Sequence, residues 1–203
     1  MRLYWAPNTR ALRAAWMLAE AGVAYERVVI DVHDAAAKGD AGFRRVSPLG
    51  KVPALQDGSA CMWDSGAICA YIADRFPEMR LAPAPDSVAR GTYLQWLVFT
   101  NSVLEPAMFE RRAASTPNPS QHGWGDFDRM LGVLRAQVAA GEWILGDRFS
   151  AADVMLGSSC LFLYRYRIIE GEPVLRAYVD RCTARPAFRE AAALDEAAPG
   201  GHA

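Results

Sequence analysis

The chain has 203 residues, of which 52% are hydrophobic and 22% are charged, and its formal net charge at pH 7 is −1. A chain of this length and composition can bury a substantial core without metals or disulfides. Its near-zero net charge gives no sign of the basic surface that binds nucleic acid or an anionic membrane. We therefore expect a small-molecule partner, no nucleic acid and no membrane.

The cysteines and histidines predict neither a disulfide framework nor a metal site. The four cysteines contain no C-x-x-C pair, and the three histidines are scattered. Strand-like residues follow Met1 directly, and no apolar run approaches the roughly 20 residues that span a bilayer. We expect reduced thiols, no metal and a cytoplasmic location. The cysteines are Cys61, Cys69, Cys160 and Cys182.

Strand and helix signals alternate over the first 77 residues. A strand over 2–6 precedes a helix over 10–21, whose apolar residues recur with helical spacing until Gly22 ends it. The further expected elements are a strand at 25–31, an irregular helical crossover at 35–45, a hairpin of strands 54–56 and 59–63 turning at Asp57-Gly58, and a helix at 65–76. This βαβαββα order suits a thioredoxin-like mixed sheet.

Every strong segment after residue 87 is helical. The expected helices lie at 88–114, interrupted or bent near Pro106, and at 126–140, 150–166, 173–184 and 186–194, with a loop at 115–125. Residues 78–87 contain two prolines and no strong periodicity, which is typical of a linker. We therefore predict an α+β chain with one domain at 1–77, a linker at 78–87 and an all-helical domain at 88–203.

One motif in the helical part predicts a helix start. Ser150 and Asp153 have the spacing of a capping box, and Phe149 and Val154 can close a hydrophobic staple around it. Such a box supports folding, so we expect Asp153 to matter for stability and not for chemistry.

The segment before the hairpin contains Val52-Pro53, directly followed by strand-like residues. Proline cannot donate a backbone hydrogen bond, so Pro53 suits a tight turn with a cis peptide bond better than a central strand. Such a turn leaves the amide and carbonyl of Val52 free for a ligand.

Asp64-Ser65-Gly66 directly precedes a helical apolar pattern. Ser65 or its neighbour is expected to cap that helix, whose exposed N–H groups attract a carboxylate. Asp64 adds a negative charge for an ammonium group. A helix cap without any ligand is the simpler interpretation of the same residues.

The turn after the first strand contains Asn8 and Thr9. A thiol nucleophile needs donors that stabilise its anion, and the Thr9 hydroxyl at a helix start can supply one. The same hydroxyl could simply cap the helix. Asn8 is a second donor candidate but also an ordinary turn residue, and Tyr4, in the strand, is expected in the core.

The Val52-Pro53 turn, the Asp64-Ser65 pair and the Ser150-x-x-Asp153 box together, in this order and spacing, resemble the glutathione transferase family over nearly the whole chain. The resemblance implies that Val52 and Pro53 hold the peptide backbone of glutathione. It also implies that Asp64 and Ser65 hold the γ-glutamyl end, and that Lys51 can contact the glycine carboxylate.

The resemblance also suggests a subclass. In theta-like and zeta-like members a serine four residues before an arginine hydrogen-bonds the sulfur, and Thr9 and Arg13 match that spacing with threonine in place of serine. Bacterial beta-class members have a cysteine where this chain has Arg10. Other branches of the family, of the tyrosine type, use a tyrosine in the first strand, about where this chain has Tyr4, so Tyr4 stays an alternative contact for the sulfur. The chain is thus similar to a bacterial transferase of the serine/threonine type.

The implied function is activation of the glutathione thiol for attack on a small hydrophobic electrophile, the reaction of detoxification. The resemblance also implies a homodimer. The implied second-substrate pocket lies between the domains, with candidates Trp96, Phe99, Thr100 and Phe109, although such an aromatic stripe can also be core. Isomerase, dehalogenase, ether-cleaving or peroxidase chemistry stays open. The alternative is a non-catalytic binding protein of the same fold, for ligand sequestration or partner docking.

Overall fold

The computed structural model describes residues 1–114 and 118–197. The chain divides into two compact units, one formed by Met1–Met79 together with the C-terminal residues from Ala184, and one formed by Arg80–Thr183. The predicted loop at 115–125 and the predicted helical domain at 88–203 therefore lie partly outside the described residues.

The first unit contains a four-stranded sheet in the order β2-β1-β3-β4. The strands are β1 Arg2–Trp5, β2 Glu26–Val29, β3 Ala54–Asp57 and β4 Ala60–Trp63. β1 pairs with β2 in parallel and with β3 antiparallel, and β3 and β4 form an antiparallel hairpin. The thioredoxin-like mixed sheet is therefore confirmed, and Gly58 turns the hairpin with a positive φ of 59°.

Short helices connect these strands. They are α1 Ala11–Glu20, α2 Ala35–Gly39, α3 Ala41–Val46 and α4 Ser65–Arg75, followed by the 3₁₀ helix η1 Pro77–Met79. The crossover that was expected to be irregular is two helices, because Asp40 ends α2 and its side chain caps α3 by accepting from the Phe43 amide.

Tyr4 lies in the core of this unit. Its ring stacks on Phe43 with centroids 5.4 Å apart, in a buried cluster that also holds Ile30, Val46 and Ala54. The core position expected for this strand aromatic is thus confirmed.

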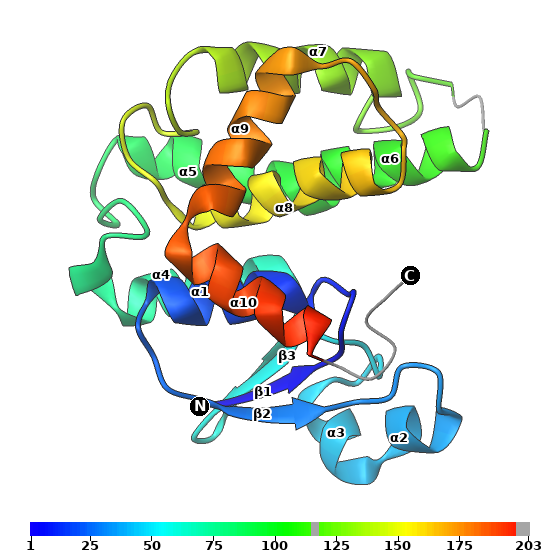
Figure 1. Ribbon diagram of the computed structural model, residues 1–203, viewed down its shortest axis with the longest axis vertical. Coiled ribbons are helices and arrows are strands. Elements are labelled where there is room, and N and C mark those ends of the chain that lie inside the picture. Colours follow the sequence, from blue (N-terminus) through cyan, green and yellow to red (C-terminus); the bar gives the residue numbers. More distant parts are fainter. Residues whose placement is uncertain (115–117, 198–203) are drawn as a thin grey trace. The chain divides into compact units, whose positions relative to one another are not determined.

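The last helix, α10 Pro186–Glu196, packs along α1 and completes the first unit (Figure 1). Arg185 forms a bidentate ion pair with Glu20, and the ring of Phe188 meets Trp16 edge-on at 5.0 Å. The sequence prediction grouped this helix with the helical domain, but its contacts are with α1.

The second unit is helical. Its elements are α5 Ala89–Phe99, the π-helix η2 Thr100–Leu104, α6 Glu105–Arg112, α7 Phe127–Ala139, α8 Ala151–Arg165 and α9 Pro173–Ala184, whose last residue falls in the first unit. The interruption predicted near Pro106 is η2, which precedes that proline. Pro106 itself is the second residue of α6, and because η2 runs directly into α6, its missing N–H interrupts the hydrogen-bond ladder of one continuous helical stretch. In the described parts of the chain, no helix is both long and apolar enough to cross a membrane.

The predicted capping box begins α8. The Ser150 side chain accepts from the Ala152 amide, and Asp153 accepts from the Ser150 amide at 2.9 Å. Asp153 is fully buried and accepts two further bonds of 2.9 Å, from the Ile144 amide and the Tyr178 hydroxyl. The carboxylate therefore also ties the loop before α8 to α9.

Candidate functional site

The start of α4 contains a buried hydroxyl held by a buried cation. Arg13 of α1 has no exposed surface, and its Nη1 donates a 3.0 Å hydrogen bond to Ser65 Oγ. A guanidinium has no acceptor, so the direction of this bond is fixed. Ser65 Oγ accepts here, and no acceptor for its own hydrogen is found among the residues that the structure describes.

Asp64 is the N-cap of α4. Its Oδ1 accepts from the Gly66 amide at 2.8 Å and from the Ala67 amide at 3.3 Å. Its φ of 78° is uncommon for a residue other than glycine, and such positions cluster at functional sites. Because Asp64 caps the helix, the Ser65 side chain is not needed for capping.

The Val52-Pro53 peptide bond is cis, as predicted. Pro53 is buried, and the half-buried Val52 packs against the cluster around Tyr4 and Phe43. Within residues 1–114 and 118–197, neither the amide nor the carbonyl of Val52 has a hydrogen-bond partner. These two groups can pair with a peptide.

The loop before Val52 is closed by a side chain that sequence reasoning missed. Buried Ser47 accepts from the Lys51 amide at 3.0 Å and donates to the Lys51 carbonyl at 2.7 Å. Gly50 has a φ of 63°, and a Cβ there would lie 3.0 Å from the Lys38 carbonyl. The Lys51 side chain is exposed.

Thr9 lies at the start of α1 with both sides of its hydroxyl engaged. Oγ1 donates to the Ala6 carbonyl at 2.7 Å and accepts from the Ala11 amide at 3.1 Å. The N-cap of α1 is Arg10, so Thr9 lies one residue before it and its hydroxyl holds the turn that leads into the helix. Asn8, the preceding residue, has a left-handed φ of 58°, which asparagine tolerates in turns.

Comparisons with known proteins give the same family for both units. Residues 1–74 match the sequence profile of the glutathione S-transferase N-terminal domain, and residues 88–181 match that of the C-terminal domain. A sphingomonad glutathione S-transferase complexed with glutathione is 30% identical, with a TM-score of 0.81 and coverage of 98% of this chain and 100% of that chain.

The chain belongs to the glutathione S-transferase family. The glutathione transferase of Methylococcus capsulatus is likewise 30% identical, with a TM-score of 0.79 over 95% of this chain and 97% of that chain. Glutathione S-transferase GstA of Escherichia coli O157:H7 is 25% identical over 196 residues, which is 94% of this chain and 96% of the relative. The family predicted from the sequence motifs is thereby confirmed.

The buried cysteines of this family member are not thiolates at neutral pH. Burial raises the pKa of Cys69 and of Cys160 to about 12, and it raises the pKa of Cys182 well above its ordinary value. Cys61, on β4, is exposed. Within residues 1–114 and 118–197, no three His, Cys, Asp or Glu side chains are placed to hold a metal ion.

The four residues predicted for the second-substrate pocket differ in exposure. Trp96 and Thr100 are buried in the helical unit, and Phe99 is half-buried with its ring 4.8 Å from that of Trp96. Phe109 of α6 is 50% exposed. Of this set, Phe109 therefore offers the largest open aromatic surface to a ligand.

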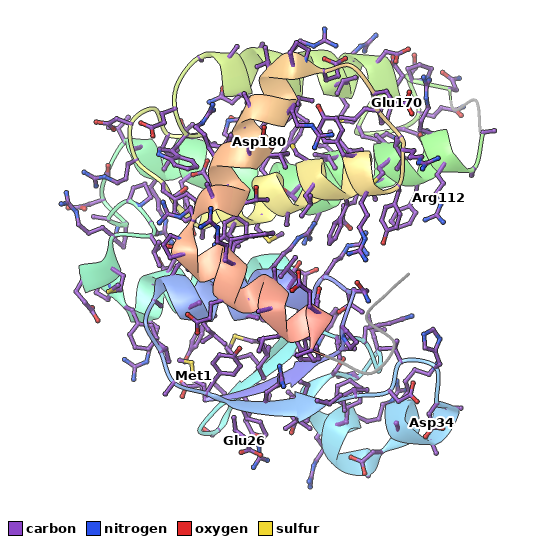
Figure 2. All side chains as sticks on the ribbon, viewed as in Figure 1. Met1, Glu26, Asp34, Arg112, Glu170 and Asp180 are labelled. Carbon is purple, nitrogen blue, oxygen red and sulfur yellow. The ribbon has the colours of Figure 1, made fainter. Side chains whose placement is uncertain are left out.

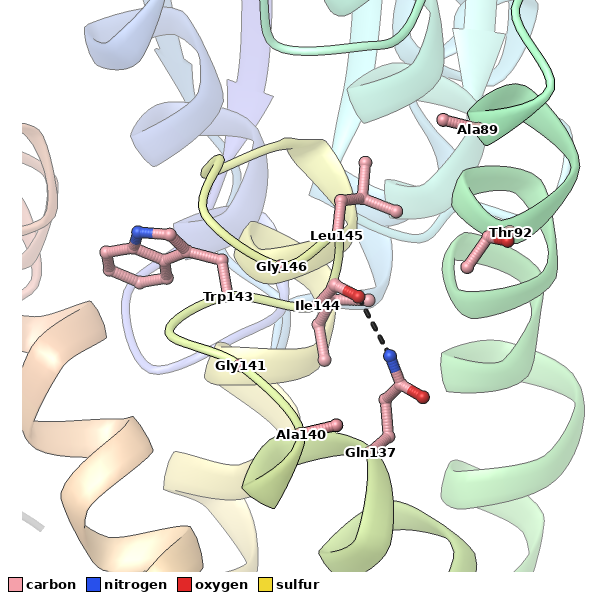
Figure 3. A pocket seen from close by; sticks show the side chains of 9 residues that line it. All are labelled: Ala89, Thr92, Gln137, Ala140, Gly141, Trp143, Ile144, Leu145 and Gly146. Carbon is pink, nitrogen blue, oxygen red and sulfur yellow. Dashed lines mark hydrogen bonds between the residues drawn. The ribbon is translucent and has the colours of Figure 1, made fainter.

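The helical unit also contains a cavity of about 300 Å³ between α5 and the end of α7 (Figure 3). Its polar side chains are those of Thr92 and Gln137, and Gln137 donates to the Ile144 carbonyl at 2.8 Å. The other lining residues are Ala89, Ala140, Gly141, Trp143, Ile144, Leu145 and Gly146. None of the predicted site residues lines it.

Figure 3 shows the loop that forms one side of this cavity. The loop from Gly141 to Gly146 folds back on itself through backbone bonds between Trp143 and Gly146, and the Trp143 ring points away from Gln137. A Cβ on Gly141 would lie 3.0 Å from the Gly146 backbone, so the loop needs glycine there. No ionisable side chain lines the cavity, so we assign it no part in the chemistry. We attribute the cavity to the shape of this loop.

Sequence reasoning did not foresee the burial of Arg13. The sequence did contain a signal for it. Arg13 is the one charged residue in the apolar run Ala11 to Ala19. A helix with such a run packs on both sides, so the Arg13 side chain has no route to solvent. A buried cation requires hydrogen-bond partners, and Ser65 is one of them.

Proposed function

We propose that this chain binds glutathione in its first unit and activates the thiol for attack on a small hydrophobic electrophile. The observation that carries the proposal is the Ser65 hydroxyl, whose oxygen is occupied by Arg13 and whose hydrogen is available to a ligand. The arginine polarises this hydroxyl, which makes it a better donor to a carboxylate.

Residues close to Ser65 in the sequence offer groups for the other parts of a glutathione molecule. The γ-glutamyl carboxylate binds the Ser65 hydroxyl at the N-terminus of α4, and Asp64 faces the ammonium group. The amide and carbonyl of Val52 pair with the peptide backbone, and the exposed Lys51 meets the glycine carboxylate.

We assign stabilisation of the thiolate to Thr9, with Asn8 as the second donor in the same turn. In the structure the Thr9 hydroxyl donates its hydrogen bond to the Ala6 carbonyl. Glutathione binding exchanges that neutral hydrogen bond for one to a charged sulfur, and hydrogen bonds to charged groups contribute about 1.5–3 kcal/mol against about 1 kcal/mol for neutral ones. The exchange is therefore favourable.

The reaction then needs little further chemistry from the protein. The thiolate sulfur attacks the electrophilic carbon, a C–S bond forms, and the leaving group departs with the bonding electron pair. The chain contributes a stabilised nucleophile and a fixed orientation.

The deciding experiment is glutathione binding with detection of the thiolate. Titration calorimetry should give heat of binding, and the bound glutathione should show the ultraviolet absorbance of a thiolate at neutral pH. Absence of binding by the folded protein would rule the proposal out.

A second candidate is a protein that binds glutathione without activating it. The observation in its favour is that both sides of the Thr9 hydroxyl are already engaged in the turn. Binding without thiolate absorbance, and without turnover of any electrophile, would establish this alternative.

Three finer proposals accompany the main one. The Thr9–Arg13 spacing and the presence of Arg10 support a serine/threonine-type subclass. The exposed Leu94 and Val98, one turn apart on α5, support burial in a homodimer, which sedimentation at twice the chain mass would test. The four free cysteines suit a reducing, cytoplasmic compartment.

A further inference from the structure

A cavity of about 600 Å³ lies where α8 is connected to α9 in the helical unit. All of its lining residues belong to that unit, and none of them takes part in the proposed function. A volume of this size falls in the range of small-molecule sites, about 300–1,000 Å³. The lining includes Tyr164, Arg167, Ile169, Glu170, Pro173 and Arg176.

Arg176 is fixed at this cavity by an aromatic ring. Its guanidinium lies over the Tyr164 ring, 3.8 Å from the centroid. The ring is itself held in place, because the Tyr164 hydroxyl donates to the Glu172 carbonyl at 2.7 Å. The ring positions the cation but supplies no counter-ion, so the positive charge stays available to an anion.

The Glu172 carboxylate, which also lines the cavity, is neutralised from outside it. Its two oxygens accept from Arg135 of α7 at 2.7 Å and 2.9 Å in a bidentate pair. Arg135 is not a lining residue. This pairing engages the carboxylate that would otherwise neutralise the arginines of the cavity.

Arg167 is the second cation of the cavity, and it is exposed. Its backbone has a left-handed φ of 53°, which is uncommon for a residue other than glycine. Over residues 1–114 and 118–197, the Arg167 side chain forms neither a hydrogen bond nor an ion pair, and Arg176 forms no ion pair. Two guanidiniums of one cavity therefore lack a counter-ion in the described structure.

The cavity also contains a carboxylate without a cation. Glu170, in the connection between α8 and α9 (Figure 2), is exposed and forms no ion pair within the part of the chain that the structure describes. Asp180, one turn after Arg176 on α9, is not a lining residue. The apolar side chains of Ile169 and Pro173 complete the chemistry of the cavity. A matching ligand combines an anionic group, hydrogen-bond donors and an apolar ring.

We propose that this cavity binds a nucleoside monophosphate. The phosphate pairs with Arg167 and Arg176, because two guanidiniums can donate to several oxygens of one dianion at once. The ribose hydroxyls donate to the Glu170 carboxylate, and the base packs on Ile169 and Pro173. A simple carboxylate without hydroxyl groups leaves Glu170 unmatched. The inference goes beyond the proposed function, since it involves no residue that holds glutathione.

Titration calorimetry with adenosine 5′-monophosphate (AMP) and adenosine tests the role of charge. The two probes differ only in the phosphate, so the wild type should bind adenosine at least about tenfold more weakly than AMP. Arg167→Gln should raise the Kd for AMP about three- to tenfold, the range for a partly exposed charge contact. Arg176→Gln should do the same, but it also removes the contact with the Tyr164 ring. A denaturant melt therefore accompanies each variant.

Arg148→Gln is the matched control, because it removes the same charge from an exposed residue of the same unit that does not line the cavity. It should leave the Kd for AMP unchanged. No binding of AMP by the wild type, equal binding of adenosine, or an equal loss in Arg148→Gln overturns the proposal.

A second probe tests the contact with the ribose. The compound 2′,3′-dideoxyadenosine 5′-monophosphate keeps the base and the phosphate but lacks both hydroxyl groups. The wild type should prefer AMP to this probe, and Glu170→Ala should remove the preference. A preference that is absent in the wild type, or unchanged in Glu170→Ala, overturns the assignment of a nucleoside.

Competition with glutathione separates this inference from the proposed function. Saturating glutathione should leave the Kd for AMP unchanged, whereas glutathione that displaces AMP overturns a separate nucleotide site. Binding of AMP that depends on Arg167 supports the inference even if the protein binds no glutathione, in which case the proposed function fails alone.

Discussion

Arg13 and Ser65, 52 positions apart in the chain, meet in the interior of the first unit, where the guanidinium donates to the serine oxygen over 3.0 Å. The pair couples the first helix of the unit to the start of α4. It also leaves the hydroxyl hydrogen of Ser65 for a ligand. Removal of the Ser65 hydroxyl therefore has separate consequences for folding and for binding.

Ser65→Ala should weaken glutathione binding by about 1.5–3 kcal/mol, the range for a hydrogen bond to a charged group. It should also lower stability, because Arg13 loses its hydrogen bond to Ser65. Calorimetric titration and a denaturant melt measure the two effects. Ser158→Ala, which removes a buried hydroxyl bonded to the Met155 carbonyl, is the control and should lower stability alone. Equal affinities in wild type and Ser65→Ala would remove Ser65 from the site.

Thr9→Ala should raise the pKa of the thiol of bound glutathione and slow conjugation about 10- to 100-fold, because one hydrogen bond to the sulfur is lost. Thr9→Ser keeps the hydroxyl and should keep the activity. The thiol is titrated by its ultraviolet absorbance. Tyr4→Phe is the control, since Tyr4 stacks on Phe43 in the core. If Tyr4→Phe alone abolished the thiolate, a tyrosine-type mechanism would replace this one.

Asp153 should make stability depend on pH. Burial raises the pKa of this carboxyl to about 6 from an ordinary 3.8. The folded state therefore binds the proton more tightly than the unfolded state, and the free energy of unfolding falls as pH rises from about 4 to about 6. The fall is at most about 3 kcal/mol. Denaturant melts across this range measure it.

Asp153→Asn should remove that pH dependence, whereas Asp34→Asn, which changes an exposed helix cap, should leave it in place. Asp153→Ala should lower the free energy of unfolding at neutral pH by about 0.5–2 kcal/mol or more, since 0.5–2 kcal/mol is the range for a lost helix cap. The folded fraction should bind glutathione normally. A stable Asp153→Ala protein that had lost binding would contradict a purely structural role.

One of the four thiols should react with Ellman's reagent in the native protein. Cys61 is exposed, while burial raises the pKa values of the other three and shields them. We expect one equivalent at neutral pH, none in Cys61→Ser, and four wild-type equivalents in guanidinium. Reaction of further thiols in the native state would reveal opening of the buried sites.

Gly50→Ala should destabilise the loop that presents Val52. Alanine is strained at a φ of 63°, and its Cβ would also lie 3.0 Å from the Lys38 carbonyl. Gly58→Ala is the matched control, because it has a φ of 59° but open space for a Cβ. The difference between the two melts isolates the crowding. We expect Gly50→Ala to weaken glutathione binding as well.

Local chemistry made much of the fold predictable. The capping box at Ser150 and Asp153, the hairpin turn at Gly58 and the Val52-Pro53 turn each depend on a few adjacent residues, and each is found as predicted. Such motifs carry their geometry in residue type and spacing, whatever the rest of the chain does.

Features that depend on distant contacts were less accessible. Ser65, which accepts a hydrogen bond from Arg13, is 52 residues away from it, and α10 joins α1 through Arg185 and Glu20, 165 positions apart. The direction of the Thr9 hydroxyl depends on the Ala6 carbonyl, which periodicity does not describe. The candidate residues Asp64 and Ser65 were nevertheless identifiable, because capping residues directly before a helical apolar pattern mark the start of a helix in the sequence.

The packing of α10 on α1 makes the first unit discontinuous in sequence. Ribosomal synthesis completes the strands and α4 long before it produces Phe188, so Trp16 lacks its ring partner until the whole helical unit has been made. A fragment ending at Met79 would leave that face of α1 uncovered, and we expect it to aggregate. Attempts to produce the glutathione-binding half alone should therefore supply α10 as well, through a circular permutation or a short linker from Met79.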